Sequence, residues 1–290
     1  MKRNEEHMES IQPVIARREV TTRILQAFHL KADKNLGQNF LVEESVVNRI
    51  AKTAELTPAD TVLEIGPGIG TLTQALALTG ASVISVELDK RLLPVLQETV
   101  GAYENVRIVQ GDILKVNIPE IVGTDNFKVC ANLPYYITTP IIMNLLEQKL
   151  PLERLVVMVQ KEVAERMIAS PGGRDYGAIS VAMQYYTEPK IAFIVKAGSF
   201  LPAPKVDSAV LVCKRRTVPR VDVDEKTFFK VVAAAFSVRR KMLTNSLKNM
   251  GGLNSEQVKS WLERAGIDGK RRAETLSLEE FAMLARAWKA

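Results

Sequence analysis

Three carboxylates stand at or just after the ends of short apolar segments in the first half of the chain. Glu64 and Glu87 end "TVLE" and "SVISVE", and Asp112 follows "VRIVQG". In a doubly wound sheet such positions converge on the ligand crevice. Negative charge there would repel a pyrophosphate and attract a ligand with a sulfonium and an ammonium group. We therefore predict binding of S-adenosylmethionine (SAM), with Glu87 accepting from the ribose hydroxyls and Asp112 from the adenine amine; helix capping by these acids is the alternative.

A glycine-rich turn follows the first of these segments. "EIGPGIGT" contains Gly66, Gly68 and Gly70, and glycine tolerates positive φ and lets a ligand approach the backbone closely. Dinucleotide-binding turns have the spacing G-x-G-x-x-G. Thr71 stands where the third glycine of that spacing would be, so the turn favours SAM over a dinucleotide.

Residues 129–136, "VCANLPYY", begin as a strand and end in an amide, a proline and two aromatic rings. The exocyclic amine of a nucleobase is a weak nucleophile, because its lone pair is delocalised into the ring. The Asn132 side-chain oxygen and the Leu133 carbonyl can accept from its N–H groups and direct the lone pair at a methyl group. Pro134 restricts Leu133 to an extended conformation, and Tyr135 offers a face for base stacking. An ordinary turn is the alternative.

Alternating strand and helix patterns predict the sheet that positions these residues. Apolar, β-branched segments separated by helical ones indicate a parallel sheet covered on both faces. The predicted strands are "TVLEI", "SVISVEL", "VRIVQGD", "FKVCANL", "RLVVMVQ", two in "ISVAMQYYTEPKIAFIVKAGSF", and "SAVLVCKRR". We therefore predict the fold class α/β, with a Rossmann-like SAM-dependent methyltransferase domain and a small all-helical C-terminal domain.

Only helical periodicity follows the last of these strands, in "EKTFFKVVAAAFSVRRKMLTNSLKNM", "SEQVKSWLERAG" and "SLEEFAMLARAWKA". We expect three parts: an N-terminal extension with a helix at residues 1–33, a SAM-binding catalytic domain at 34–216, and a basic helical domain at 217–290.

The net charge of +6 is concentrated near the C-terminus. Residues 205–290 contain 18 Lys and Arg against 10 Asp and Glu, whereas residues 38–204 contain 14 against 18. This asymmetry indicates a polyanionic partner, most often nucleic acid, with a merely solvated surface as the alternative.

One basic helix face is predicted in this part. Arg240, Thr244 and Lys248 recur every four residues in one predicted helix, so they would share a face, while Phe236, Leu243 and Leu247 would pack inward. The residues expected to contact RNA phosphates are Arg239, Arg240, Lys241, Lys248, Lys270, Arg271 and Arg272.

Several classes of protein are disfavoured by composition. The only histidines are His7 and His29, which argues against a metal site or a histidine-based triad. The two cysteines, Cys130 and Cys213, fit buried thiols in a reducing cytoplasm. No segment has the length and hydrophobicity of a membrane span, and the first residues lack the apolar core of a signal peptide.

A series of short motifs makes most of the chain after Lys34 resemble a known family. In order they are "KNLGQNFL", "EIGPGIG", "ISVELD", "GDIL", "NLPY", "QKEVAERM", "YGAISVAMQYY" and "FLPAPKVDSAV". The series resembles the bacterial small-subunit ribosomal RNA adenine dimethyltransferases. That family is similar to the erythromycin-resistance large-subunit methylases and the mitochondrial transcription factor B proteins.

The resemblance implies N6 dimethylation of two adjacent adenosines in the 3′-terminal hairpin of 16S rRNA. It also implies that Asn39 and Leu41 border the cofactor, Gly66 lies under it, and Asn132 stands between cofactor and base. Phe200 is expected to stack on the base opposite the tyrosine of NLPY. We expect a monomer that meets the rRNA within a small ribosomal subunit or its precursor.

Three other functions remain open at the level of sequence. A large-subunit rRNA methylase would use the same chemistry. A non-catalytic RNA-binding assembly factor would not need both an intact NLPY segment and an intact glycine turn. A glutamine-modifying protein methylase would also use an amide, a proline and an aromatic residue, but its substrate gives no reason for the basic C-terminal part.

Overall fold

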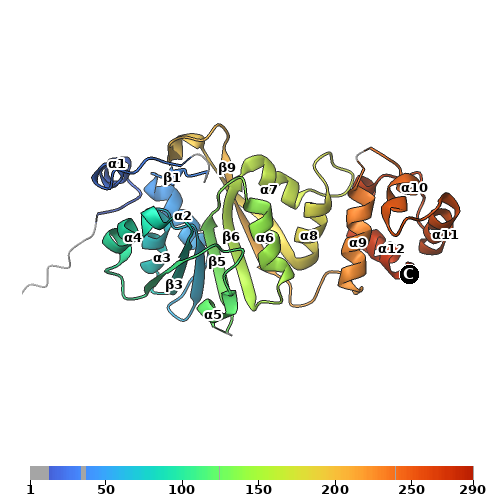
Figure 1. The fold of residues 1–290 in the computed structure, drawn as a ribbon, viewed down its shortest axis with the longest axis horizontal. Helices are drawn as coiled ribbons and strands as arrows, with labels where there is room; N and C mark the ends of the chain where they lie inside the picture. Colours follow the sequence, from blue (N-terminus) through green and yellow to red (C-terminus); the bar gives the residue numbers. More distant parts are fainter. Residues whose placement is uncertain (1–12, 34–36, 124, 239, 290) are drawn as a thin grey trace, which may run out of the picture.

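The computed structural model describes residues 13–33, 37–123, 125–238 and 240–289. A twisted sheet with helices on both faces forms the larger part of the molecule, and the C-terminal helices lie beyond one edge of that sheet (Figure 1). The strand order in the seven-stranded sheet is β4-β3-β2-β5-β6-β9-β7. This order, with parallel strands on either side of β2, is that of a Rossmann-like fold, as predicted.

The sheet is parallel from β4 to β6, and β9 runs antiparallel to both β6 and β7. Its strands are β2 (Thr61–Ile65), β3 (Ser82–Glu87), β4 (Val106–Gln110), β5 (Phe127–Asn132), β6 (Leu152–Gln160), β7 (Thr187–Val195) and β9 (Ser208–Arg215). A separate antiparallel pair is made by β1 (Phe40–Leu41) and β8 (Phe200–Leu201).

Successive strand residues face opposite sides of the sheet, and both sides are buried. Val62 packs into one apolar cluster and its neighbour Leu63 into another. The first cluster includes residues of α2 (Glu44–Thr53) and α3 (Thr71–Ala77). The second includes residues of α5 (Ile118–Val122), α6 (Thr138–Glu147) and α7 (Lys161–Ile168). This two-sided burial explains the nearly continuous apolar runs in the strands.

The N-terminal helix α1 (Arg18–Ala27) packs beside α4 (Leu93–Val100), which follows a short 3-10 helix, η1 (Lys90–Leu92). Gln74 of α3 holds the segment that leads into α1. Its Oε1 accepts from the Ile15 N–H at 2.9 Å, and its Nε2 donates to the Pro13 carbonyl at 3.2 Å. The part of the extension from residue 13 is therefore attached to the body of the sheet.

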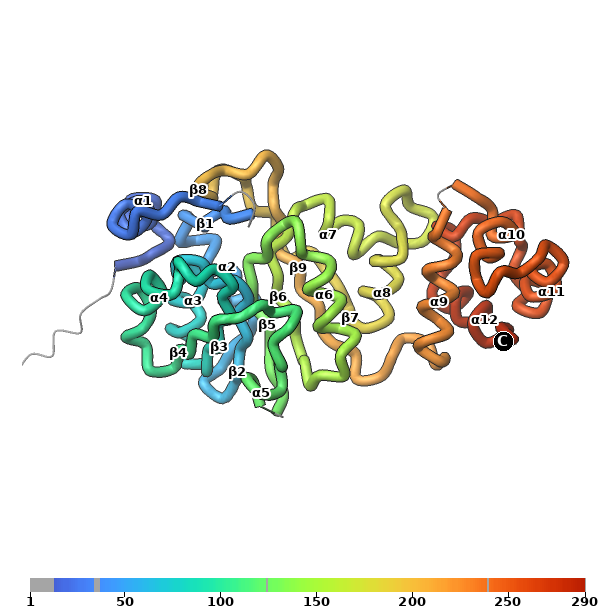
Figure 2. The backbone as a smooth tube through the Cα atoms, viewed as in Figure 1, coloured from blue at the N-terminus to red at the C-terminus, as the bar shows by residue number. Residues whose placement is uncertain are grey.

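The strand predicted at "ISVAMQYY" is wrong, because these residues form the helix α8 (Ala178–Tyr186). α8 lies between the sheet and the C-terminal helices, so six of its nine residues are buried (Figure 2). A short apolar run that is buried on nearly all sides has no clear period, and it cannot be distinguished from a buried strand by pattern.

The single long helix predicted from Glu225 is also wrong. α9 (Glu225–Phe236) ends before a turn in which Arg240 has a φ of 66°, and α10 (Leu243–Ser246) begins a new direction. The break lets Met242 pair with Arg272. Arg240 therefore does not share a helix face with Thr244 and Lys248. Leu243 and Leu247 are buried as predicted, and Phe236 is partly buried against the same core.

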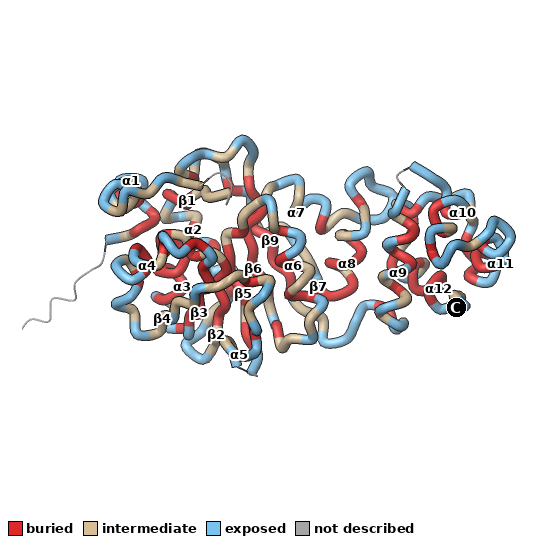
Figure 3. The backbone as a smooth tube through the Cα atoms, viewed as in Figure 1, coloured by how far each residue is buried: buried red, intermediate tan, exposed pale blue. Residues whose placement is uncertain are grey.

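The remaining elements are η2 (Ala197–Ser199), η3 (Leu247–Asn249), α11 (Ser255–Ala265), η4 (Ala273–Thr275) and α12 (Leu278–Arg286). One apolar core extends from the sheet through α8 into α9, α11 and α12 (Figure 3). Stacked rings join α8 to α9: Tyr185 on Phe228 and Tyr186 on Phe229, with centroids 5.0 and 5.5 Å apart. The domain division at residues 216 and 217 stays a prediction, and packing is continuous across it.

Candidate active site

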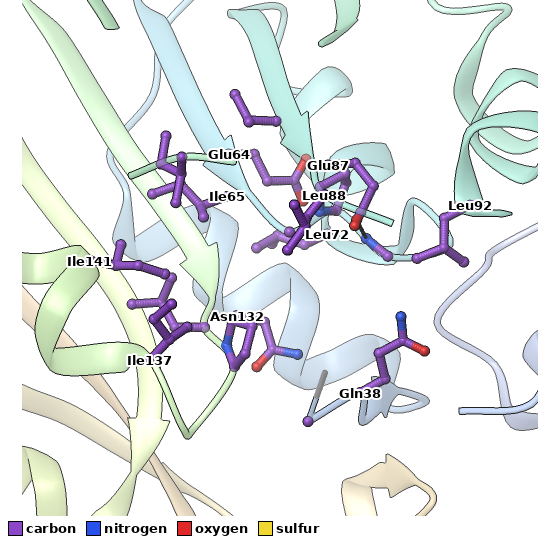
Figure 4. A pocket seen from close by; sticks show the side chains of 18 of the residues that line it. Gln38, Glu64, Ile65, Leu72, Glu87, Leu88, Leu92, Asn132, Ile137 and Ile141 are labelled. Atoms are coloured by element: carbon purple, nitrogen blue, oxygen red, sulfur yellow. Dashed lines mark hydrogen bonds between the residues drawn. The ribbon is translucent and has the colours of Figure 1, made fainter. Parts of the chain in front are cut away.

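The carboxyl ends of β2, β3 and β5 open onto a pocket, with about 1080 Å³ of empty space that is continuous with solvent. Glu64 and Glu87 lie together on one side of it, and Asn132 lies across from them at the end of β5 (Figure 4). The predicted residues that line this pocket are Asn39, Leu41, Gly66, Glu87, Asp112, Asn132, Leu133, Pro134 and Tyr135.

The glycine turn has the backbone that its sequence suggested. Gly66, Gly68 and Gly70 have φ values of 68°, 64° and 90°. A Cβ on Gly70 would lie 2.8 Å from Val100 Cγ1, whereas a Cβ on Gly66 would meet nothing within 4 Å. Gly70 is required for packing, and Gly66 leaves open a backbone surface against which a ligand can lie.

Glu87 is held in a fixed orientation at the end of β3. Its Oε1 accepts from the Asp89 N–H at 2.8 Å, and its Oε2 accepts from the Gly68 N–H at 3.1 Å. Burial raises the pKa of Glu87, and the two N–H donors act in the opposite direction. Each oxygen keeps a further lone pair, so the carboxylate can also accept from two neighbouring hydroxyls.

Glu64 is more deeply buried and is held differently. It is 1% exposed, and its Oε2 is bonded to the hydroxyls of Ser85 at 2.6 Å and Thr73 at 2.7 Å. Burial raises the pKa of Glu64 to about 7. Near neutral pH this group therefore carries only part of a negative charge, less than the sequence argument assigned to it. The more exposed Asp112 accepts from the Leu114 N–H at 3.0 Å.

The NLPY segment is held by bonds from neighbouring elements. Asn132 Nδ2 donates to the Asn39 carbonyl at 3.3 Å, which leaves the amide oxygen to accept from a ligand. Leu133 N donates to the Met158 carbonyl at 3.1 Å and so continues the sheet. The Tyr135 hydroxyl is bonded to Ser208 Oγ at 2.6 Å.

Phe200 does not lie where the resemblance put it. It pairs with Leu41 across the β1–β8 pair, and it is 1% exposed within the core that contains α2 and α3. Phe200 is absent from the described lining of the pocket. The expected stacking of Phe200 on a base therefore does not hold in this structure, because packing covers the ring.

Two turns bring part of the predicted basic group together. The Met242–Arg272 pairing and the bond from Leu243 N to the Arg271 carbonyl at 2.8 Å join residues 240–243 to residues 268–272. Arg240, Lys241, Lys270 and Arg272 are all exposed in these turns, and we refer to these four residues as the basic turn cluster.

The other three members of the predicted group are placed differently. Arg271 is engaged with Glu280 and the Thr275 carbonyl. Lys248 is partly buried in η3. Arg239 lies outside the described residues.

Sequence reasoning missed several residues that line the pocket. Gln38 bridges two segments, since its Oε1 accepts from the Asp33 N–H at 2.9 Å and its Nε2 donates to Asp89 Oδ2 at 3.0 Å. Tyr136 lies at the same pocket beside Tyr135. Both residues could have been predicted from their position, because each is next in the sequence to a residue that was predicted to line the pocket. The buried hydroxyl of Thr71, another lining residue, has no hydrogen-bond partner in the described structure.

The described ranges contain no group of three or more His, Cys, Asp or Glu side chains placed to hold a metal ion. No helix in the part of the chain that the structure describes has the length and hydrophobicity needed to cross a membrane.

These features fit the chemistry of SAM. The open surface at Gly66 can receive a nucleoside, the fixed Glu87 can accept from ribose hydroxyls, and the acidic lining suits a cation. The unpartnered Thr71 hydroxyl is available to a ligand.

Comparison with known proteins gives consistent results. Residues 29–289 match the model of the family described as ribosomal RNA adenine dimethylase. The ribosomal RNA small subunit methyltransferase A of Clostridium botulinum is 48% identical over 266 residues, which cover 91% of this chain and 96% of that protein. The protein of that name from Moorella thermoacetica is 50% identical over 263 residues, covering 87% and 91%.

Two solved structures are similar over most of their length. A dimethyladenosine transferase from Plasmodium falciparum has a TM-score of 0.68 and 25% identity, covering 84% of this chain and 95% of that one. The 23S rRNA methyltransferase ErmE has a TM-score of 0.65 and 29% identity, covering 86% and 99%. On the match of the family model and the identity to these relatives, the chain belongs to the ribosomal RNA adenine dimethylase family.

Proposed function

We propose that this protein transfers methyl groups from SAM to N6 of two adjacent adenosines in the 3′-terminal hairpin of 16S rRNA. The observation that carries the proposal is the position of Asn132. Its amide is fixed by the Asn39 carbonyl and faces the pocket that also contains Glu87 and the glycine turn. An acceptor for an amine and a site for a cationic nucleoside thus occupy one pocket.

The bound cofactor would supply an electrophilic methyl group on a sulfonium. Glu87 would hold the ribose, Asp112 the adenine amine, and Gly66 would leave room for the nucleoside. On the substrate side, the Asn132 oxygen and the Leu133 carbonyl would accept from the two N–H groups of the target amine. These bonds strengthen as the nitrogen becomes pyramidal, so they favour the transition state over the ground state.

The Tyr135 ring would hold the target base by stacking, with its position fixed by Ser208. The methylated ammonium is acidic enough to lose its proton to water. A side-chain base is therefore unnecessary in this mechanism.

Methylation of large-subunit rRNA is the second candidate function. The observation that favours it is the similarity of the fold to that of the 23S rRNA methyltransferase ErmE. Sequence identity supports the small-subunit target, since the relatives named for the small subunit are 48% and 50% identical whereas ErmE is 29% identical.

We further propose that a monomer meets the rRNA within a small ribosomal subunit or its precursor, in the cytoplasm. The buried free thiols of Cys130 and Cys213 are compatible with that reducing compartment.

The test is methyl transfer from labelled SAM into small subunits that lack dimethyladenosine, with large subunits as the comparison and the product nucleosides identified. We expect N6,N6-dimethyladenosine in small-subunit RNA only. Label in the large subunit, or in protein, would contradict the proposal.

A further inference from the structure

Tyr136 differs from every other aromatic residue of the protein in its exposure. All 9 Phe, 6 Tyr and 2 Trp residues lie within the described ranges, and Tyr136 is the one that is exposed, with 55% of its surface accessible. Its neighbour Tyr135 is only partly accessible and is tied to Ser208. A large flat ring that is exposed to water at the rim of a pocket provides an apolar surface on which a ligand can pack.

The ring of Tyr136 is supported from within the pocket rim. A Cβ on Gly37 would lie 3.4 Å from Tyr136 Cδ1, so the ring lies close over this glycine, which has a φ of 60°. The backbone beneath it is also fixed. The Pro134 carbonyl accepts from the Ile137 N–H at 3.2 Å and from Thr138 Oγ1 at 3.0 Å, at the start of α6. The Tyr136 ring is therefore held in place by its surroundings. This reduces the conformational entropy that is lost when a ligand stacks on the ring.

The surroundings indicate which ligand would use this ring. Tyr136 follows the residues proposed to hold the target base, whereas the groups proposed for the cofactor, such as Glu87 and Gly66, come from β3 and the glycine turn. The loop between β8 and β9 leads into Ser208, the first residue of β9 and the partner of Tyr135, and this loop carries the exposed Lys205. Proteins bind unpaired nucleotides by combining exposed aromatic rings with positively charged side chains.

We infer that Tyr136 stacks on the nucleobase adjacent to the one being methylated and so acts as a specificity-determining residue. This inference rests on the proposed function and extends it from one base to two. Consecutive tyrosines would hold consecutive bases: Tyr135 the target in the pocket, and Tyr136 its neighbour at the rim. Because an RNA strand runs through the pocket in one direction, Tyr136 would contact the second adenosine when one of the two is the target, and the next nucleotide along the strand when the other is.

The test combines variants of Tyr136 with small subunits in which one of the two adjacent adenosines is replaced by uracil. Uracil stacks less well than adenine, so in one of the two altered subunits the wild-type enzyme should show a higher KM for the remaining adenosine. Tyr136→Ala should raise KM for unaltered subunits roughly 5- to 140-fold, from the usual range for loss of one stacked base. The KM of this variant for the subunits should not change further when uracil replaces the neighbouring adenosine, and its KM for SAM should equal that of wild type.

Two further variants separate stacking from packing. Tyr136→Phe should restore the low KM that Tyr136→Ala loses, because it keeps the ring. Tyr136→Leu should not, although it still covers Gly37. Leu78→Ala, which removes an exposed side chain at the far end of α3, provides the control for unchanged activity.

The outcomes distinguish this inference from the proposed function. If wild type methylates the small subunits but Tyr136→Ala has the same KM and the same sensitivity to uracil, the inference is wrong and the proposed function stands. If Tyr136→Leu behaves as wild type, the ring has only a packing role and the inference is again wrong. If wild type transfers no methyl groups to small-subunit RNA, the proposed function and the inference fail together.

Discussion

Glu64 and Glu87 lie near the carboxyl ends of neighbouring strands but differ in what surrounds each carboxyl group. Glu87 accepts from two backbone N–H groups, which favour its charged form. Glu64 is bonded to two side-chain hydroxyls in a fully buried site, where burial dominates and raises its pKa to about 7. Because the hydroxyl of Thr73 or Ser85 can either donate or accept, the site can accommodate a protonated Glu64.

This pKa makes stability depend on pH in a defined direction. Between pH 4.5 and about 7 the folded protein keeps a proton on Glu64 that the unfolded chain has lost. The contribution of Glu64 to the free energy of unfolding therefore falls as pH rises through that window, by about 3 kcal/mol in total. Glu64→Gln, which stays neutral, should gain stability relative to wild type by this amount as pH rises through the window.

Urea unfolding of both proteins at several pH values measures the difference. Glu162→Gln, on the exposed part of α7, controls for the loss of one carboxylate. A difference between Glu64→Gln and wild type that is constant with pH would contradict the prediction.

Asn132 gives a second prediction at this scale. Asn132→Ala should lower the single-turnover rate of methyl transfer by about 10²- to 10³-fold, as is usual when one transition-state hydrogen bond is removed. RNA affinity should change far less, because the missing acceptor matters most as the amine becomes pyramidal. Asn126→Ala, at an exposed position just before the same strand, is the matched control. A wild-type rate of methyl transfer with saturating RNA would show that Asn132 has no role in the chemical step.

The residues that sequence could assign to the pocket are those at strand ends. Glu87, Asp112 and Asn132 follow apolar runs, and the geometry of a parallel sheet brings such ends to one edge. The sequence could not show that Phe200 is buried and Tyr136 is exposed, because exposure depends on what packs over each ring. The pairing of β8 with β1 buries Phe200, and no local pattern around either residue indicates that pairing.

Among the elements, the segment from Pro13 to α1 is bonded to α3 through Gln74 and to α2 through the ion pair of Arg17 with Glu44. Gln74 accepts from Ile15 N and donates to the Pro13 carbonyl and to the Tyr103 hydroxyl. Gln74→Ala should reduce the free energy of unfolding by roughly 1–3 kcal/mol, because it leaves the buried Ile15 N–H without its partner. Urea unfolding tests this, with Gln26→Ala on the exposed part of α1 as the control. Equal stability of the two variants would contradict the prediction.

The order of elements is predictable through β6, where strands and helices alternate. The sequence of α8 resembles a strand because burial between the sheet and α9 removes the polar face that marks a helix. The turn after α9 escapes prediction for a different reason. Residues 237–242 have helical spacing, and only the pairing of Met242 with Arg272 shows that the chain leaves the helix there.

At the scale of the whole molecule, the excess positive charge of the C-terminal part predicts an electrostatic contribution to RNA binding. Reversing Arg240 and Arg272 to Glu, both in the basic turn cluster, should weaken binding to small subunits. It should also reduce the slope of log affinity against log salt by roughly 1 for each phosphate that the variant no longer neutralises. SAM affinity should stay the same, because its pocket lies at the sheet.

The matched control reverses Lys259 and Arg264 on α11, which carry the same charge elsewhere in the helical part. Substrate affinity measured across a salt series gives the answer. If both double variants weaken binding equally, net charge rather than the basic turn cluster explains binding.

The stacked rings between α8 and α9 join the C-terminal helices to the sheet through packed side chains. Tyr185 and Tyr186 of α8 pack on Phe228 and Phe229 of α9 within one continuous apolar core. Such packing favours a single distance between the basic turn cluster and the NLPY pocket. An RNA gripped at one end would present to the pocket only the nucleotides that lie that length away, so the target would be chosen by measurement along the RNA as well as by recognition of its bases.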